Sequence, residues 1–463
     1  MNLRDYQINM LNGAIEALNN NMNPFVVSPT GSGKMIVIAS LAKHLQSKVL
    51  IVEHRIELIK QAVEKLELIN EKAGLIVSGV RDPNPNASIK VGMIQTIHRR
   101  ELEDWEPDII IIDEAHLAAA ASYKKLLGKL ADSPRVCFSA TPWRLDGKGF
   151  RDVCDTIVLG PTIKQLVRRG YLVPTEYLAY DVVDFTECKI VGNEYDQEQV
   201  ATMMEDITGE IVETWFAVYR NRSTIVFAAN TTHSKKLCEA FRAKGVKAEH
   251  IDGTTPDAVR AAIINRVKSG ETQVLCNCGI VIEGFDAPIV SCVVLAIATK
   301  SLSKFLQCCG RGMRLHPESG KTDLVVMDFG GCYKNHGVPE DDRTWTLEDR
   351  NVRGGKKEFI EDFQTSAVEK AQVQALVYQQ GYDYGKDERY QEEVWKRNYA
   401  TTAAAARRAR PALAGEMPPP LWLPASWRDY WRSLEEYRIS LGLPKDYSER
   451  MAKIEIIKRR SGY

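Results

Sequence analysis

The sequence predicts an α/β fold: two tandem domains, each a parallel sheet covered by helices, followed by a mainly helical C-terminal extension. Short apolar segments that do not alternate with polar residues recur along the first third of the chain. Amphipathic stretches such as 33–46 and 55–70 lie between several of them, and the middle third repeats the same plan. Strands buried on both faces have this composition, and strand–helix alternation favours a parallel sheet.

The expected strands fall into two groups that show no sequence repeat. In the first third they are 24–28, 48–53, 89–95, 108–115 and 135–140. In the middle third they are 223–228, 247–252, 272–277, 291–296 and 323–329. Residues 158–205 join the two groups. We therefore expect domains at 1–157, 158–345 and 346–463.

The composition changes after about residue 335. An alanine run precedes RRARP, and PPPLWLP is typical of an extended spacer. A helix is expected between a cap at Ser426 and a stop at Gly442, with an aromatic and apolar face. That face docks on a core or stacks on nucleic-acid bases, and the sequence leaves both open.

The bulk composition excludes several classes of protein. The 61 Lys and Arg balance the 61 Asp and Glu, so any polyanion site must be a local patch. The N-terminus lacks the apolar core of a signal peptide and the apolar runs are too short to span a bilayer, so we expect a cytoplasmic protein without membrane contact. The ten cysteines form no CxxC pair, which argues against zinc and disulfides.

Residues 28–35, SPTGSGKM, have the pattern of a phosphate-binding loop between an expected strand and an expected helix. Glycines let the backbone N–H groups surround a phosphate, the helix dipole favours an anion, and a lysine supplies a positive charge. The predicted nucleotide-binding residues here are Pro29, Thr30, Gly31, Ser32, Gly33, Lys34 and Met35.

Met35 departs from the pattern, because this position normally carries a hydroxyl that binds magnesium. A thioether is a soft ligand that this hard cation disfavours, although water can replace a missing ligand. The loop therefore belongs to an active ATPase, to a slow one, or to a nucleotide-binding clamp.

A second predicted site, Asp113-Glu114-Ala115-His116, follows four isoleucines. Ligands bind beyond the carboxyl ends of parallel strands, so we expect it to meet the phosphate-binding loop at one sheet edge. Asp113 is placed to hold magnesium, directly or through water. Glu114 is placed to orient and deprotonate the attacking water.

With these motifs the sequence resembles superfamily 2 helicases and translocases of the DEAD/DEAH type over roughly residues 1–345. The resemblance implies two RecA-like domains, ATP and magnesium as cofactors, and hydrolysis in the cleft between the domains. It implies an adenine contact by Gln7 in LRDYQ, with Arg4 beside it in the nucleotide site, and nucleotide contacts by Gly284 and Asp286 in EGFDAP. It also implies coupling of hydrolysis to domain movement by His116, Ser139 and Thr141.

The segment QCCGRGMR resembles the helicase motif that carries the arginine finger. Arg311 and Arg314 are three residues apart and share one helix face. Gln307 and Gly310 let that face approach the first domain. Because a positive charge from the second domain stabilises phosphoryl transfer, hydrolysis would require the cleft to close.

Segments such as ATPWRLDGKGF, RRGYLVP and DFGGCYKNHG resemble RadD-like helicases, bacterial or phage-encoded. That resemblance implies action on DNA, single-stranded or branched, in repair, recombination or replication; RNA stays possible. The strand would run across both domains, held by its phosphates. The predicted nucleic-acid contacts are His54, Arg55, Gln95, Thr96 and Arg99.

Three functional readings stand. The first is an ATP-driven DNA translocase or helicase. The second is a nucleic-acid-binding module that hydrolyses ATP slowly or not at all, or that recruits a protein partner through its C-terminal region. The third is the motor of a restriction or defence complex, in which a partner would supply the nuclease.

Overall fold

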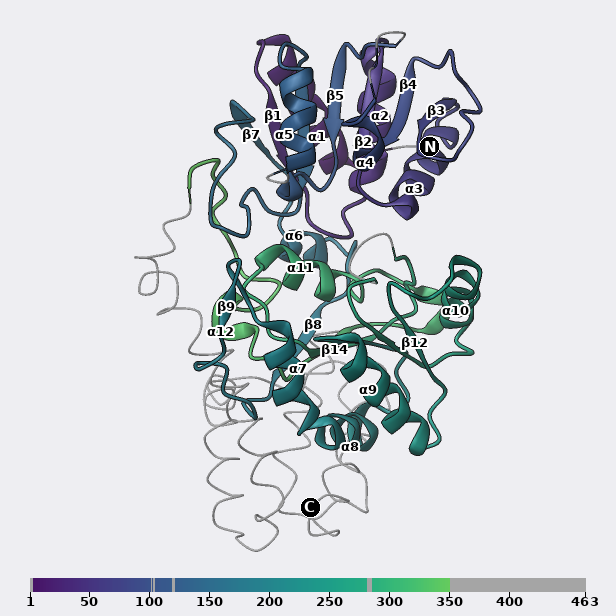
Figure 1. The fold of residues 1–463 in the computed structure, drawn as a ribbon, viewed down its shortest axis with the longest axis vertical. Coiled ribbons are helices and arrows are strands. Elements are labelled where there is room, and N and C mark those ends of the chain that lie inside the picture. The colour runs from purple at the N-terminus through teal and green to yellow at the C-terminus, as the bar shows by residue number, and fades with distance from the viewer. Residues whose placement is uncertain (1–2, 101, 103–104, 119–120, 281–284, 350–463) are drawn as a thin grey trace, which may run out of the picture. The chain divides into compact units, whose positions relative to one another are not determined.

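The computed structural model describes residues 3–349, except for 101, 103–104, 119–120 and 281–284. Two lobes each contain one parallel sheet (Figure 1). The predicted helix between Ser426 and Gly442 and the rest of the C-terminal extension lie outside the described residues. In the described part of the chain, no helix is both long and apolar enough to cross a membrane.

The first lobe holds a seven-stranded sheet in the order β3-β4-β2-β5-β6-β1-β7. Its elements are α1 Asp5–Asn19, β1 Pro24–Val27, α2 Lys34–Leu45, β2 Val49–Glu53, α3 Ile56–Glu67, β3 Ala73–Ile76, β4 Ile89–Met93, α4 Ile94–Ile97, β5 Ile109–Ile112, η1 Ala115–Leu117, α5 Ala121–Lys129, β6 Arg135–Ser139 and β7 Thr156–Leu159. The strands β1 and β2 are buried along their whole length, as the apolar segments predict.

The second lobe holds a six-stranded sheet in the order β12-β13-β11-β14-β15-β8. Its elements are α6 Ile163–Arg168, β8 Thr175–Ala179, β9 Ile190–Val191, β10 Glu194–Tyr195, α7 Gln197–Glu205, α8 Thr208–Tyr219, β11 Thr224–Ala228, α9 Thr231–Ala243, β12 Ala248–Ile251, α10 Asp257–Ser269, β13 Val274–Asn277, β14 Cys292–Ala296, α11 Leu302–Gly310, η2 Pro317–Ser319, β15 Leu324–Asp328 and α12 Tyr333–His336. Both sheets are parallel, which confirms the predicted fold class.

Some expected segments differ from the structure. The strand expected at 89–95 ends at Met93, where α4 begins, and the strand expected at 108–115 ends at Ile112. Strands β3, β7 and β8 have no counterpart among the expected strands. Of these, β7 is an edge strand with half-exposed residues, so it lacks the apolar signature of a buried strand; it extends the first sheet to Leu159.

After the second lobe the chain returns to the first. Residues 345–349, the return segment, contact residues 143–151, which follow β6. Phe150 N donates to Leu347 O at 2.8 Å, and the rings of Trp143 and Trp345 are 5.0 Å apart. Leu347 is 3% exposed and belongs to the apolar core of the first lobe. The first lobe is therefore completed by residues that follow the second lobe in sequence.

This packing predicts that Leu347→Ala destabilises the protein by about 2–5 kcal/mol, the usual cost of truncating a buried leucine. Urea unfolding followed by tryptophan fluorescence measures it. Leu145→Ala is the matched control, because Leu145 lies in the contacted segment but is 45% exposed. Equal stabilities of the two variants would show that the return segment does not complete the core.

Candidate active site

The phosphate-binding loop connects β1 to α2. Gly31 and Gly33 have φ values of 87° and 81°, in the left-handed region that glycine adopts without strain. Ser32 is buried, and its hydroxyl donates to Pro29 O at 2.7 Å. A glycine turn of this kind that opens a helix presents backbone N–H groups to an anion, as the sequence predicts.

Lys34 connects this loop to the two predicted catalytic carboxylates. Its Nζ lies 2.7 Å from Asp113 Oδ1 and 2.5 Å from Glu114 Oε1. Burial alone would lower the pKa of Lys34, but the two carboxylates outweigh it and raise that pKa. Asp113 is 1% exposed, and burial raises the pKa of its carboxyl group. Burial would also raise the pKa of Glu114, but the charge of Lys34 and a hydrogen bond from His116 outweigh it and lower that pKa. Lys34 is therefore a cation at neutral pH and Glu114 an anion.

The residues predicted to couple hydrolysis to movement contact this centre. Glu114 has a φ of 46°, a left-handed conformation that is unusual for a residue with a side chain. His116 Nδ1 lies 3.3 Å from Glu114 Oε2 and 3.0 Å from Ser139 Oγ. Thr141 N donates to Ser139 Oγ at 3.3 Å. The end of β6 is thereby connected to the Glu114 carboxylate through one histidine.

The second lobe reaches the same carboxylate through α11. Gln307, which is 2% exposed, donates from Nε2 to Glu114 Oε2 at 3.2 Å. A Cβ atom at Gly310 would lie 2.6 Å from the Thr30 side chain, so a side chain at that position would collide with the phosphate-binding loop. The predicted approach of Gln307 and Gly310 to the first lobe is thus present in the structure.

The two predicted arginines are held by the second lobe. The prediction that they share one helix face is wrong, because α11 ends at Gly310, Arg311 caps it and Arg314 lies beyond it in a β-bridge with Leu172. Arg311 is buried and donates to Phe285 O at 2.8 Å. Arg314 forms an ion pair with Asp286, and its Cγ lies 4.0 Å from the position of a Cβ on Gly31. Gly284 lies outside the described residues. Arg314 therefore lies next to the phosphate-binding loop of the first lobe. Arg311 is instead buried within the second lobe.

Arg4 and Gln7 lie at the N-terminus of α1, beside the phosphate-binding loop, where the adenine contact is expected. Gln7 Oε1 accepts from Arg4 N at 2.9 Å, and Gln7 Nε2 donates to Ser32 O at 3.0 Å. The Tyr6 hydroxyl donates to the same carbonyl at 2.9 Å. The N-terminus of α1 is in this way attached to the phosphate-binding loop.

The predicted nucleic-acid residues separate into two sets. Gln95 and Arg99 are exposed, and Gln95 Nε2 donates to His54 O at 3.2 Å. Arg55 donates to Gly279 O of the second lobe at 3.2 Å. Thr96 is buried, and its hydroxyl accepts from Ser78 N at 3.1 Å, so its side chain faces the interior of the first lobe.

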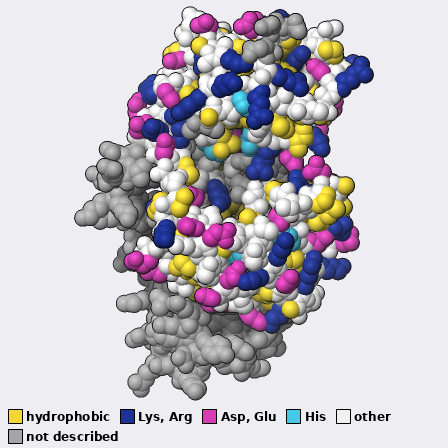
Figure 2. Space-filling model, in the orientation of Figure 1, with side chains coloured by type: hydrophobic (Ala, Val, Ile, Leu, Met, Phe, Trp, Pro, Cys, Tyr) yellow, Lys and Arg dark blue, Asp and Glu magenta, His cyan; other side chains and the backbone are white. Residues whose placement is uncertain are grey.

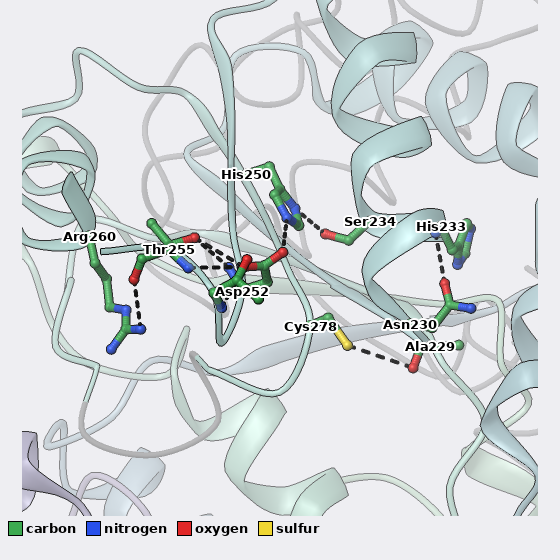
Figure 3. A network of polar contacts seen from close by, with 10 residues as sticks. Ala229, Asn230, His233, Ser234, His250, Asp252, Thr255, Arg260 and Cys278 are labelled. Carbon is green, nitrogen blue, oxygen red and sulfur yellow. Dashed lines mark hydrogen bonds and ion pairs between the residues drawn. The ribbon is translucent and has the colours of Figure 1, made fainter. Parts of the chain in front are cut away.

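A polar network lies at the carboxyl edge of the second sheet (Figure 3). His250 contacts Ser234 Oγ at 2.8 Å and Asp252 Oδ2 at 3.1 Å. Hydrogen bonds, foremost from Thr254, lower the pKa of Asp252. Arg260 donates to Thr255 O at 3.0 Å and to Glu57 of the first lobe at 3.2 Å. The network thereby reaches α3, the helix that follows Arg55, a connection that no sequence pattern predicted.

His233, at the start of α9, gives a prediction on pH. It is fully buried, neither ring nitrogen has a hydrogen-bond partner among the described residues, and burial lowers its pKa to about 4. In the unfolded chain the imidazole takes up a proton near pH 6.5, whereas in the folded protein it stays neutral down to about pH 4. Protonation therefore favours the unfolded chain, and stability that is complete above pH 6.5 is lost as the pH falls toward 4. We expect a loss of about 3 kcal/mol from this residue over that range.

Urea unfolding of the wild type and of His233→Leu between pH 4 and 7 tests this expectation, with His44→Leu as the control because His44 is exposed. His233→Leu should have the smaller pH dependence. The same dependence in all three proteins would contradict it.

The residues fit a magnesium ion in part. Asp113 supplies a buried carboxylate beside the phosphate-binding loop, but Met35 offers no oxygen where the motif usually has a hydroxyl. Within the described ranges, no group of three or more His, Cys, Asp or Glu is arranged to hold a metal ion. Any magnesium here would therefore depend on Asp113, water and the nucleotide phosphates.

A phosphate-binding loop and two carboxylates in one α/β lobe, with two arginines just after helix α11 of a second lobe, form the site of a P-loop nucleotide hydrolase. Residues 1–144 match the family described as type III restriction enzyme, res subunit, and residues 204–316 match the helicase conserved C-terminal domain. A 51.5 kDa protein of a Lactococcus phage is 31% identical over 69% of this chain and 68% of its own length. The chain belongs to the superfamily 2 helicases and translocases, which hydrolyse ATP.

Two further comparisons agree with this family. The Saccharomyces cerevisiae protein named "Putative ATP-dependent helicase IRC3" is 30% identical over 71% of this chain, which spans about half, 52%, of that relative. The structure of the ATP-dependent type ISP restriction-modification enzyme LlaBIII bound to DNA superposes with a TM-score of 0.54 at 15% identity. It covers 89% of this chain and 33% of the enzyme, and it supports the fold alone.

Proposed function

We propose that this protein is a DNA translocase or helicase that hydrolyses ATP between its two lobes. The observation that carries the proposal is the hydrogen bond from Gln307 to Glu114, because it connects the second lobe directly to the predicted general base. In the proposed reaction Glu114 takes a proton from the attacking water, Lys34 leaves the carboxylates to contact the phosphates, and Arg314 neutralises charge on the phosphoryl group. Magnesium held by Asp113 would neutralise the β- and γ-phosphate oxygens.

DNA is the proposed polymer. The type ISP enzyme that shares the fold was solved with DNA, and the sequence resembles RadD-like helicases. Figure 2 shows positive and negative side chains interspersed over both lobes on one face, which agrees with the zero net charge. Affinity would then come from local contacts of His54, Arg55, Gln95 and Arg99 with phosphates rather than from a general basic field.

We further propose that the residues after about 350 choose among DNA structures or bind a protein partner, in repair, recombination, replication or a phage defence context. Binding of the full chain and of residues 1–349 to forked, single-stranded and duplex DNA compares the two forms. Unchanged preferences in the shortened chain would remove the role in choosing DNA structures.

The proposal is tested by ATP hydrolysis with magnesium, in the presence of single-stranded DNA, forked DNA or RNA. We expect DNA to increase the rate, and Met35→Thr to increase it further because threonine restores the missing hydroxyl. Met35→Leu, which removes the sulfur without adding oxygen, is the matched control. If RNA increased the rate and neither form of DNA did, RNA would replace DNA as the proposed polymer.

A second candidate, an ATP-gated nucleic-acid clamp with slow turnover, is favoured by Met35 itself. In that case the wild type would bind DNA in an ATP-dependent way with little hydrolysis, and Met35→Thr would restore turnover.

A further inference from the structure

The segment of residues 169–173, which we term the connector, follows α6 and leads into β8. Its Tyr171 ring is surrounded by the residues that flank the expected adenine site. The Arg4 guanidinium carbon lies 4.3 Å from the ring centroid, and that of Arg169 lies 5.2 Å from it. The Tyr6 ring packs edge-on at 5.4 Å, and Arg169 forms an ion pair with Asp5. These contacts attach the connector to the N-terminus of α1.

The next residue of the connector contacts the phosphate-binding loop. Leu172 is 2% exposed, and its Cδ2 lies 2.8 Å from where a Cβ would stand on Gly31. A nucleotide with its phosphates at Gly31 and Lys34 and its base near Gln7 would therefore have Tyr171 beside the base. Tyr171 is half-buried, and the Arg4 guanidinium lies over its ring, so a flat nucleobase that stacks there takes the place of that guanidinium.

The connector also pairs with the segment that carries the arginines. Leu172 forms an antiparallel bridge with Arg314, and Val173 N donates to Met313 O at 2.9 Å. Three consecutive residues, 171 to 173, thus contact the base side of the site, the phosphate-binding loop and the arginine segment. Leu172, the residue that pairs with Arg314, directly follows Tyr171 in the chain.

We propose that Tyr171 is the stacking platform for the nucleobase of ATP, and that the connector relates occupancy by the base to the position of Arg314. This inference rests on the proposed ATP hydrolysis at this site. A triphosphate without a base would bind the phosphate-binding loop but would not engage Tyr171. Because purines stack more strongly than pyrimidines, Tyr171 would also favour ATP over UTP.

The experiment compares Tyr171→Leu with Tyr171→Phe in the full chain. Equilibrium binding of ATP and of inorganic tripolyphosphate is measured first, followed by kcat/KM for ATP and UTP. Tyr195→Leu is the matched control, because Tyr195 is also half-buried and carries a cation, Lys300 Nζ, 5.3 Å from its ring. Thermal unfolding checks that each variant is folded.

We expect Tyr171→Leu to weaken ATP binding roughly 10-fold and to reduce the preference for ATP over UTP by a smaller factor, because UTP also loses some stacking. Tripolyphosphate binding should stay unchanged, and Tyr171→Phe and Tyr195→Leu should resemble the wild type. Equal losses for ATP and tripolyphosphate, or no loss for either, would overturn the role of Tyr171 while the proposed hydrolysis stands. Absence of ATP binding in the wild type would overturn both.

Discussion

Glu114→Gln is expected to lower the rate of ATP hydrolysis by about 10²–10⁴-fold while ATP binding stays close to that of the wild type. The amide keeps the size and hydrogen-bonding capacity of the side chain, but it cannot accept a proton from water. Lys34 and His116 lower the pKa of Glu114 despite its burial, so the carboxylate is ionised at neutral pH and can accept a proton. When the nucleotide phosphates draw Lys34 away, the carboxylate loses a strong partner and becomes more basic.

Single-turnover hydrolysis with magnesium, with and without DNA, measures this effect separately from product release. The control is Glu57→Gln, which changes a carboxylate that pairs with Arg260 across the lobes without contacting Lys34. If Glu114→Gln retained a rate within a few-fold of the wild type, another group would be the base. A loss of ATP binding in the same variant would instead indicate that Glu114 mainly holds Lys34 in place.

The fold follows from local patterns wherever the strands are buried. The segments IIII at 109–112 and VLIVE at 49–53 have no polar alternation, and both became central strands of a parallel sheet. The segment that joins the lobes was harder to predict. β8 is the edge strand of the second sheet and has only two buried residues, so its composition does not separate it from a polar connection.

The candidate site could be predicted where its chemistry depends on a short motif. Lys34, Asp113, Glu114 and Gln307 meet in space as their motifs indicate. The contacts that depend on distant segments could not be predicted. Arg260 meets Glu57 from 203 positions away, and Leu347 completes a core whose other buried members precede residue 158. Tyr171 lies in the segment RRGYLVP, where an aromatic residue close to arginines was the one available signal.

Arg314→Ala is expected to lower the rate of hydrolysis by about 10³–10⁵-fold, the contribution of an arginine finger in other nucleotide hydrolases. Arg314 lies beside Gly31 of the phosphate-binding loop and pairs with Asp286, so it is half-exposed and has a partner to leave when a nucleotide binds. Arg311 is less suited to this test, because its guanidinium is buried against Phe285 O and its removal would also disturb the second lobe.

Single-turnover hydrolysis of ATP by Arg314→Ala measures the loss, and Arg266→Ala is the matched control because Arg266 pairs with Glu249 on the second lobe alone.

Gly310→Ala provides an independent test that the finger acts by closure. Its added methyl group would meet Thr30 and hold α11 away from the phosphate-binding loop, so it should lower kcat while both arginines are present. A slow Arg314→Ala beside an unaffected Gly310→Ala would mean that the arginine acts without the close approach of α11. Equal rates for Arg314→Ala and Arg266→Ala would remove Arg314 from the reaction altogether.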